Sequence, residues 1–197
     1  MVFITEFYMK KIINQREVNV ASHDLYLPKS MGGKGHFLQV LVQIAEQLDA
    51  MLSYHCKVLV TRIDLRLYQG TKDNKPVSDF IRRLRKHLVT NGHKRFAYVW
   101  CREQNCSDVQ HYHFALITDA NANRHPHKLI KLIEYLWEAW GHVKPFIPKN
   151  CYSIIKRGDE DAFAQQFSRL SYLAKVDTKQ NRSKSTNDYS TSRLKIK

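Results

Sequence analysis

The sequence has few cysteines, and none of the four forms a CxxC pair with another. Structural zinc sites use closely spaced cysteine and histidine pairs, and disulfide frameworks use many cysteines in a short secreted chain. Cys56, Cys101 and Cys151 lie in or beside strand-like segments, which suits reduced thiols in a cytosolic protein. The pattern argues against a disulfide framework and gives little support to a zinc site built from Cys101, Cys106 and histidines.

A long apolar run is also missing, because no stretch approaches the length that a helix needs to cross a bilayer. The first residues, MVFITEFYMKK, break their apolar run at Glu6 and carry basic residues only after it. A secretory signal has the opposite order. We therefore expect a soluble intracellular protein that makes no membrane contact.

Acidic residues are scarce beside basic ones, with 18 Asp and Glu against 32 Lys and Arg. The formal net charge is +14 and the pI is near 9.7. This excess indicates a polyanionic partner, and nucleic acid is the first candidate. Apolar residues make up 43% of the 197 residues, enough for one domain with a hydrophobic core and too little chain for two ordinary domains.

Apolar periodicity predicts alternating strands and helices along most of the chain. The first helix is predicted from an apolar stripe at helical spacing, which consists of Phe37, Leu41, Ile44, Leu48 and Leu52. Strand-like segments span 56–68, 95–103, 111–118 and 151–156, and further helices span 78–92, 126–140 and 158–177. Ser78 and Asp159 are the expected N-caps, and Gly92 and Gly141 follow the expected helix ends.

This order of elements predicts an α+β fold of the βαββαβ type, with a preceding N-terminal helix. Such a fold has a four-stranded antiparallel sheet with helices on one face, and we expect the other face to be open for a site. Residues 1–35, which include the glycine-rich run KSMGGKG, are predicted to form an arm before a domain of residues 36–178. Residues 179–197 are polar and basic, so a disordered tail is expected there.

The segment QHYHFALIT, residues 110–118, places two histidines in a predicted strand. Because side chains alternate along a strand, His111 and His113 share one face. Glu103 ends the preceding strand, so its carboxylate can meet both imidazoles and leave positions open on Mg²⁺ or Mn²⁺ for water or a phosphate. Asp64 is a reserve acidic ligand. The alternative is a pair of half-buried, hydrogen-bonded sheet histidines beside a solvent-facing Glu103.

The last predicted helix carries a tyrosine that its core does not need. Its apolar stripe consists of Phe163, Phe167, Leu170 and Ala174. Tyr172 lies off this stripe, and Lys175 lies on the same side of the helix as Tyr172. A tyrosine hydroxyl beside a lysine and a metal-bound phosphate is a candidate nucleophile. The alternative is a surface tyrosine beside a solvated lysine.

Together, HYHFALI with Glu103 and the later SYLAK segment resemble motifs of the HUH endonucleases, the family of rolling-circle replication initiators and relaxases. The segment RLSYLAKVDTK is most similar to replication proteins of filamentous phages and prophages. The resemblance spans about residues 56–178 and implies a metal site of Glu103, His111 and His113, with Tyr172 as nucleophile and Lys175 as the motif lysine. TRIDLRLY, residues 61–68, is the best candidate for the first family motif.

The resemblance implies a metal-dependent nicking and strand-transfer enzyme for single-stranded DNA in a bacterial cytoplasm. It would act at the replication origin of a phage or mobile element, with a host helicase or polymerase as a further partner. Many phage initiators carry two tyrosines on the active helix, whereas Ser168 and Val176 stand one turn from Tyr172 here. A single-tyrosine mechanism or a second subunit is therefore expected.

DNA contacts are expected from five arginines, which are Arg62, Arg66, Arg82, Arg83 and Arg85. For the helix segment RRLRKH, residues 82–87, a solvated face is the alternative. A different class of function also fits the predicted fold, namely a non-catalytic nucleic-acid-binding module that stacks bases on Tyr112 or Tyr98. A degenerate enzyme that serves as a regulator is a third possibility.

Overall fold

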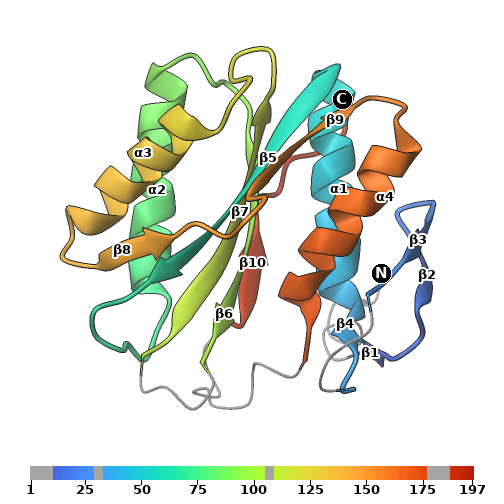
Figure 1. Ribbon diagram of the computed structural model, residues 1–197, viewed down its shortest axis with the longest axis horizontal. Coiled ribbons are helices and arrows are strands. Elements are labelled where there is room, and N and C mark those ends of the chain that lie inside the picture. Colours follow the sequence, from blue (N-terminus) through green and yellow to red (C-terminus); the bar gives the residue numbers. More distant parts are fainter. Residues whose placement is uncertain (1–10, 29–32, 105–108, 177–186) are drawn as a thin grey trace, which may run out of the picture.

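Six strands form one antiparallel sheet at the centre of the molecule (Figure 1). The computed structural model describes residues 11–28, 33–104, 109–176 and 187–197. The sheet order is β10-β6-β7-β5, and both β8 and β9 pair with the remaining edge of β5. The six strands are β5 (Lys57–Arg66), β6 (Ala97–Glu103), β7 (His111–Asp119), β8 (Val143–Phe146), β9 (Tyr152–Lys156) and β10 (Tyr189–Thr191).

The four predicted strands are confirmed as β5, β6, β7 and β9. The helices α2 (Lys75–Thr90) and α3 (His127–Glu138) follow β5 and β7 in the chain, as the βαββαβ order requires. The spatial order β6-β7-β5-β9 puts the histidine strand between the other two site strands. Register then pairs His113 with Asp64 on one side and His111 with Glu103 on the other.

Helices cover both faces of the sheet, so the prediction that they lie on one face is wrong. On one face α2 and α3 pack on Leu59, Ile63 and Phe114. The helices α1 (Leu38–Tyr54) and α4 (Glu160–Leu170) lie on the other face (Figure 1). They pack there on Val58 and Val60. The physical reason is that β5 and β7 are apolar on both sides, which is typical of strands buried between two layers.

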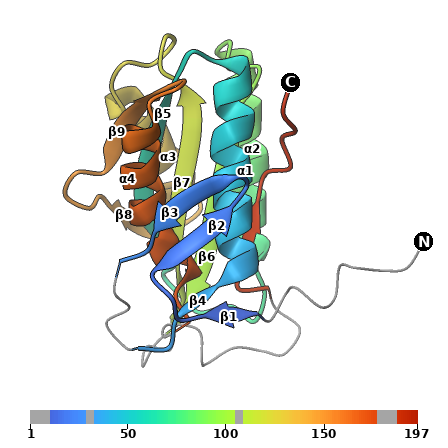
Figure 2. The ribbon, with the colours of Figure 1, turned by 90° about the vertical axis from the view of Figure 1, so that its right-hand side faces the viewer.

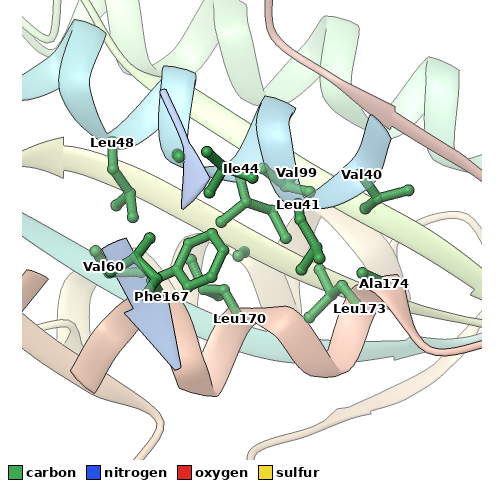
Figure 3. Close-up of a cluster of buried hydrophobic side chains, with 14 of the residues drawn as sticks. Val40, Leu41, Ile44, Leu48, Val60, Val99, Phe167, Leu170, Leu173 and Ala174 are labelled. Carbon is green, nitrogen blue, oxygen red and sulfur yellow. The ribbon is translucent and has the colours of Figure 1, made fainter. Parts of the chain in front are cut away.

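The second of these cores positions the site. The apolar stripes predicted for α1 and α4 meet in it, with Leu41, Ile44 and Leu48 facing Phe167 and Leu170 (Figure 3). Asp159 caps α4 as predicted, since its side chain accepts a hydrogen bond from the Ala162 backbone N–H at 3.0 Å. This packing fixes the end of α4, from which the chain continues directly into the candidate site.

The chain before α1 forms strands, and among the described residues no helix precedes Leu38. The hairpin of β2 (Glu17–Val20) and β3 (His23–Tyr26) lies against α1 and α4 (Figure 2). Its apolar side chains are buried in the same core, so residues 11–28 belong to the fold and do not form a separate arm. The short strands β1 (Ile12–Ile13) and β4 (His36–Phe37) pair beside it. Most of the run KSMGGKG lies outside the described residues.

The end of the chain is ordered from residue 187, which corrects the predicted disordered tail; residues 179–186 lie outside the described part. Here β10 adds to the sheet beside β6. The buried amide of Gln47 then holds the following segment, because its Oε1 accepts from the Ser192 hydroxyl at 2.6 Å and the Leu194 N–H at 3.2 Å. Composition predicted a tail because this segment is polar, but its polar groups find partners within the fold.

Two smaller features complete the comparison with the predicted elements. Helix α2 starts at Lys75, with Asn74 at its N-cap and a proline in its first turn, so Ser78 lies inside the helix and not at its start. Gly92 follows the helix end as predicted. Within the described residues, no helix is both long and apolar enough to span a membrane.

Candidate metal centre and adjacent tyrosine

Glu103, His111 and His113 converge at one end of the sheet, on the face that α1 and α4 cover. One ligand atom from each lies within 4.8 Å of the others. Glu103 Oε2 lies 3.4 Å from His111 Nε2 and also contacts His113 Nε2. Glu103 and His113 are only 4% and 5% exposed, whereas His111 is half-buried. The predicted meeting of two imidazoles and a carboxylate is therefore present in the structure.

Asp64 lies on the other side of the His113 ring. Its Oδ1 accepts a hydrogen bond from His113 Nδ1 at 2.6 Å, while Glu103 faces Nε2. A carboxylate at the second ring nitrogen is the usual way in which proteins orient a metal-binding histidine. The structure thus places the reserve ligand Asp64 where it positions His113 and leaves Nε2 facing Glu103 and His111.

Charge at this cluster is tightly paired. Burial alone would raise the pKa of Glu103, but its contacts with His111 and His113 outweigh burial and hold that pKa well below its ordinary range. Burial likewise opposes protonation of His113, yet the hydrogen bonds with Asp64 and Glu103 raise its pKa above the ordinary value. The Glu103 carboxylate is therefore ionised and stabilises positive charge beside it.

The donor set fits a divalent metal ion. Two imidazole nitrogens and one carboxylate oxygen approach one another from two neighbouring strands, and Asp64 supports His113 from behind. Such a set fills part of the coordination sphere of a divalent metal ion and leaves the remaining positions to other ligands. Glu103, His111 and His113 are thus a possible metal site whose metal the structure does not identify.

Tyr172 lies beside this cluster. It belongs to the 3₁₀ turn η1 (Ser171–Ala174), which continues α4, and its ring centroid is 5.2 Å from that of His113 in an edge-on arrangement. Its neighbours Leu173 and Ala174 are buried in the core and anchor the turn (Figure 3). Burial and the negative charge of Glu103 raise the pKa of Tyr172 above its ordinary value, although Arg62 opposes them.

Lys175 follows this turn, and the backbone around it contacts the segment that precedes α1. Its Nζ is 4.5 Å from the Tyr172 ring centroid, and the residue is only 8% exposed. Lys175 forms an isolated β-bridge with His36, and the Val176 N–H donates to Gly35 O at 3.1 Å. No carboxylate of the described residues forms an ion pair with Lys175. The predicted proximity of Tyr172 and Lys175 is thus present, in a 3₁₀ turn and not in the α-helix itself.

Arg62 also belongs to this cluster. Its guanidinium carbon is 4.8 Å from the Tyr172 ring centroid, and its Nη2 is 3.8 Å from Asp64 Oδ1 and 3.3 Å from His113 Nδ1. The sequence placed Arg62 only among general DNA contacts. Arg62, Asp64 and Arg66 alternate along β5, and this alternation was the available signal that all three share the histidine face.

The remaining predicted DNA contacts divide between the two faces. Arg66 lies directly opposite His111, on the site face. Arg82, Arg83 and Arg85 lie on α2, which covers the opposite face. Of the two aromatic platforms considered for a simple binding module, Tyr112 is fully buried and Tyr98 is half-buried against Phe114. A base therefore has no access to Tyr112.

Comparison with known families adds one decisive observation. A family model described as the YagK/YfjJ C-terminal domain matches residues 24–188. The chain belongs to this family. The matched region begins within β3 and includes α1 to α4 and every residue of the candidate site.

The YagK/YfjJ C-terminal domain description names no activity, so the likeness to HUH endonucleases rests on the His-x-His strand and the residues around it. Searches of curated proteins and of solved structures gave no significant match.

Proposed function

We propose that the protein is a metal-dependent endonuclease and strand transferase that nicks single-stranded DNA through a 5′-phosphotyrosine intermediate. Its biological role would be to initiate rolling-circle replication of a phage or another mobile element. The observation that carries this proposal is the placement of Tyr172 edge-on to His113, with its ring centroid 5.2 Å away. The ring of the candidate nucleophile thus lies directly beside the candidate metal site, where the proposed reaction requires it.

Glu103, His111 and His113 would hold Mg²⁺ or Mn²⁺. The bound cation would polarise a phosphodiester and offset the Glu103 charge that raises the pKa of Tyr172. Asp64 keeps His113 in the orientation and tautomer that present Nε2 to the site. In the proposed reaction these four residues would hold and orient the cation that stabilises negative charge.

Tyr172 would form the covalent bond with the DNA. Its hydroxyl oxygen attacks phosphorus as the phenolic proton leaves, the bond between phosphorus and the 3′ oxygen breaks, and that oxygen gains a proton. One phosphodiester is exchanged for another, so the bond energy is retained for later rejoining. The products are a 5′-phosphate on Tyr172 and a free 3′-hydroxyl, which a host polymerase with its helicase would extend.

Lys175 supports a phosphate in this position. Lys175 is only 8% exposed and forms no ion pair with a carboxylate of the described residues, so no carboxylate neutralises its charge. A phosphate group beside Tyr172 would provide the missing negative charge. The cationic groups of Lys175 and Arg62 both lie against the Tyr172 ring. They would stabilise the negative charge that develops on the phosphate and on the phenolate oxygen during the reaction.

The test is incubation with circular single-stranded DNA and Mn²⁺, followed by denaturing electrophoresis for protein bound covalently to DNA. Tyr172→Phe removes only the hydroxyl, so the fold and DNA affinity should persist while cleavage and the adduct disappear. Tyr152→Phe is the matched control, since Tyr152 is exposed on β9 and should retain parental activity.

Peptide mass spectrometry of the adduct after nuclease trimming identifies the nucleophile. We expect the nucleotide on Tyr172. Tyr189 is the informative competitor, because it pairs with Cys101, which in turn pairs with His113. A nucleotide on Tyr189 or on any residue other than Tyr172 would contradict the assignment, and the absence of any adduct would contradict the proposed activity.

A further inference from the structure

The site face of the sheet extends beyond the metal cluster to a second feature, formed by β5 and β8. Residues that pair directly across an antiparallel sheet point to the same face. His113 pairs with Asp64, and Asp64 pairs with Phe146 on β8. Arg66 pairs with His111. Phe146 and Arg66 therefore lie on the same face as the candidate metal ligands, about two strand spacings or 10 Å from His113.

Phe146 is an apolar residue whose side chain is exposed to solvent. It is 46% exposed and belongs to neither hydrophobic core, whereas Pro145 beside it is buried. The guanidinium carbon of Arg66 lies 5.0 Å from the Phe146 ring centroid. This exposed ring lies beside a cation and near the candidate metal site, so it is accessible to a ligand that binds there.

The backbone under this pair is tied to neighbouring elements, although the register of β5 and β8 shifts between Asp64 and Arg66. Trp137 Nε1 donates to Arg66 O at 2.7 Å, which ties the end of β5 to α3. Phe146 is held by the pairing of β8 with β5. A platform on fixed strands binds a flat ligand with a smaller loss of conformational entropy than one on a loop.

We infer that Phe146 and Arg66 form a base-stacking platform for a nucleotide next to the phosphodiester that Tyr172 attacks. This inference rests on the proposed function. An aromatic ring offers a face to any base, and a guanidinium beside it attracts the phosphate of the same strand. The net charge of +14 and the continuity with the metal cluster favour a DNA strand over an apolar protein partner.

The experiment compares two fluorescein-labelled single strands of equal length, one with normal bases and one with abasic sites. Binding is measured by anisotropy in the Tyr172→Phe background, which prevents cleavage. Phe146→Ala should weaken binding of the normal strand by about 5-fold to about 100-fold and leave the abasic strand nearly unchanged. Phe146→Trp should restore the preference for bases, and Phe146→Leu should not.

Tyr135→Ala is the matched control, because Tyr135 is an exposed aromatic residue on α3 and should not affect either strand. Equal binding of the normal strand by Phe146→Ala and its parent would overturn the platform, as would an equal loss for both strands. If Phe146→Ala in a protein that retains Tyr172 still forms the adduct, while the base preference measured in the Tyr172→Phe background is unchanged, the platform fails and the proposed function stands. If no adduct forms even in the parental protein, the proposed function itself fails.

Discussion

At the scale of single residues, His113 lies between two carboxylates that contact different ring nitrogens. This arrangement assigns different tasks to two acidic residues of similar chemistry. Glu103 contacts both histidines in the possible metal site, whereas Asp64 contacts the His113 ring from the far side. These different roles follow from the register of the strands, because Asp64 on β5 pairs with His113 and Glu103 on β6 pairs with His111.

Replacement of Asp64 should therefore weaken metal binding without removing a ligand. We expect Asp64→Ala to lower the affinity for Mn²⁺ by about 10-fold to 100-fold, the usual cost of losing a carboxylate behind a metal-binding histidine. Asp64→Asn should fall between this variant and the parent, because its amide oxygen still accepts from Nδ1. Titration calorimetry with Mn²⁺ measures both values.

Asp79→Ala is the control for this prediction. Asp79 is a similarly buried carboxylate with basic partners, but it lies on α2, which covers the opposite face of the sheet. Its loss should leave Mn²⁺ affinity unchanged. Parental affinity in Asp64→Ala would show that His113 needs no support from Asp64.

At the scale of elements, the strand before α1 supports the segment that carries Lys175. Gly35 O accepts from the Val176 N–H, and Gly35 has a φ of +80°. A Cβ at this position would lie 2.4 Å from Ile13 O and 2.2 Å from Asn14 Oδ1. Only glycine fits both the left-handed conformation and the close approach.

Gly35→Ala should therefore destabilise the protein and displace Lys175. The expected loss is roughly 2 to 4 kcal/mol, from the left-handed conformation together with overpacking against β1. Urea denaturation measures this loss, and the rate of adduct formation should fall with it. Gly33→Ala is a matched control, since Gly33 also has a positive φ but its Cβ would meet no atom within 4 Å. Equal losses in the two variants would contradict a supporting role for Gly35.

The elements that could be predicted from the sequence are those with local patterns. Strand alternation placed His111 and His113 on one face, and helical spacing identified the stripes of α1 and α4. The polar end of the chain gave no such pattern, because β10 exists through its pairing with β6 and through the partners of Gln47. Likewise, the positioning role of Asp64 follows from the pairing of β5 with β7, a contact between residues 49 positions apart.

At the scale of the whole molecule, the two helical layers give the sheet two different faces. One face carries the metal cluster, Tyr172 and Arg66, and the other lies under α2 with Arg82 and Arg85. Composition gives only the net charge of +14 and cannot say which face meets a polyanion. The layered arrangement therefore predicts which face of the sheet binds DNA, because DNA that reaches Tyr172 lies on the face away from α2.

The salt dependence of DNA binding tests which face of the sheet contacts the DNA. Each phosphate contact with a single strand contributes about −0.7 to the slope of log affinity against log salt concentration, through release of counterions. Arg66→Gln should make the slope shallower by about 0.7, because Arg66 lies on the site face. Arg82→Gln together with Arg85→Gln should leave it unchanged, although two charges are removed. A larger change in the α2 double variant than in Arg66→Gln would place the DNA on the α2 face, too far from Tyr172 for the proposed reaction.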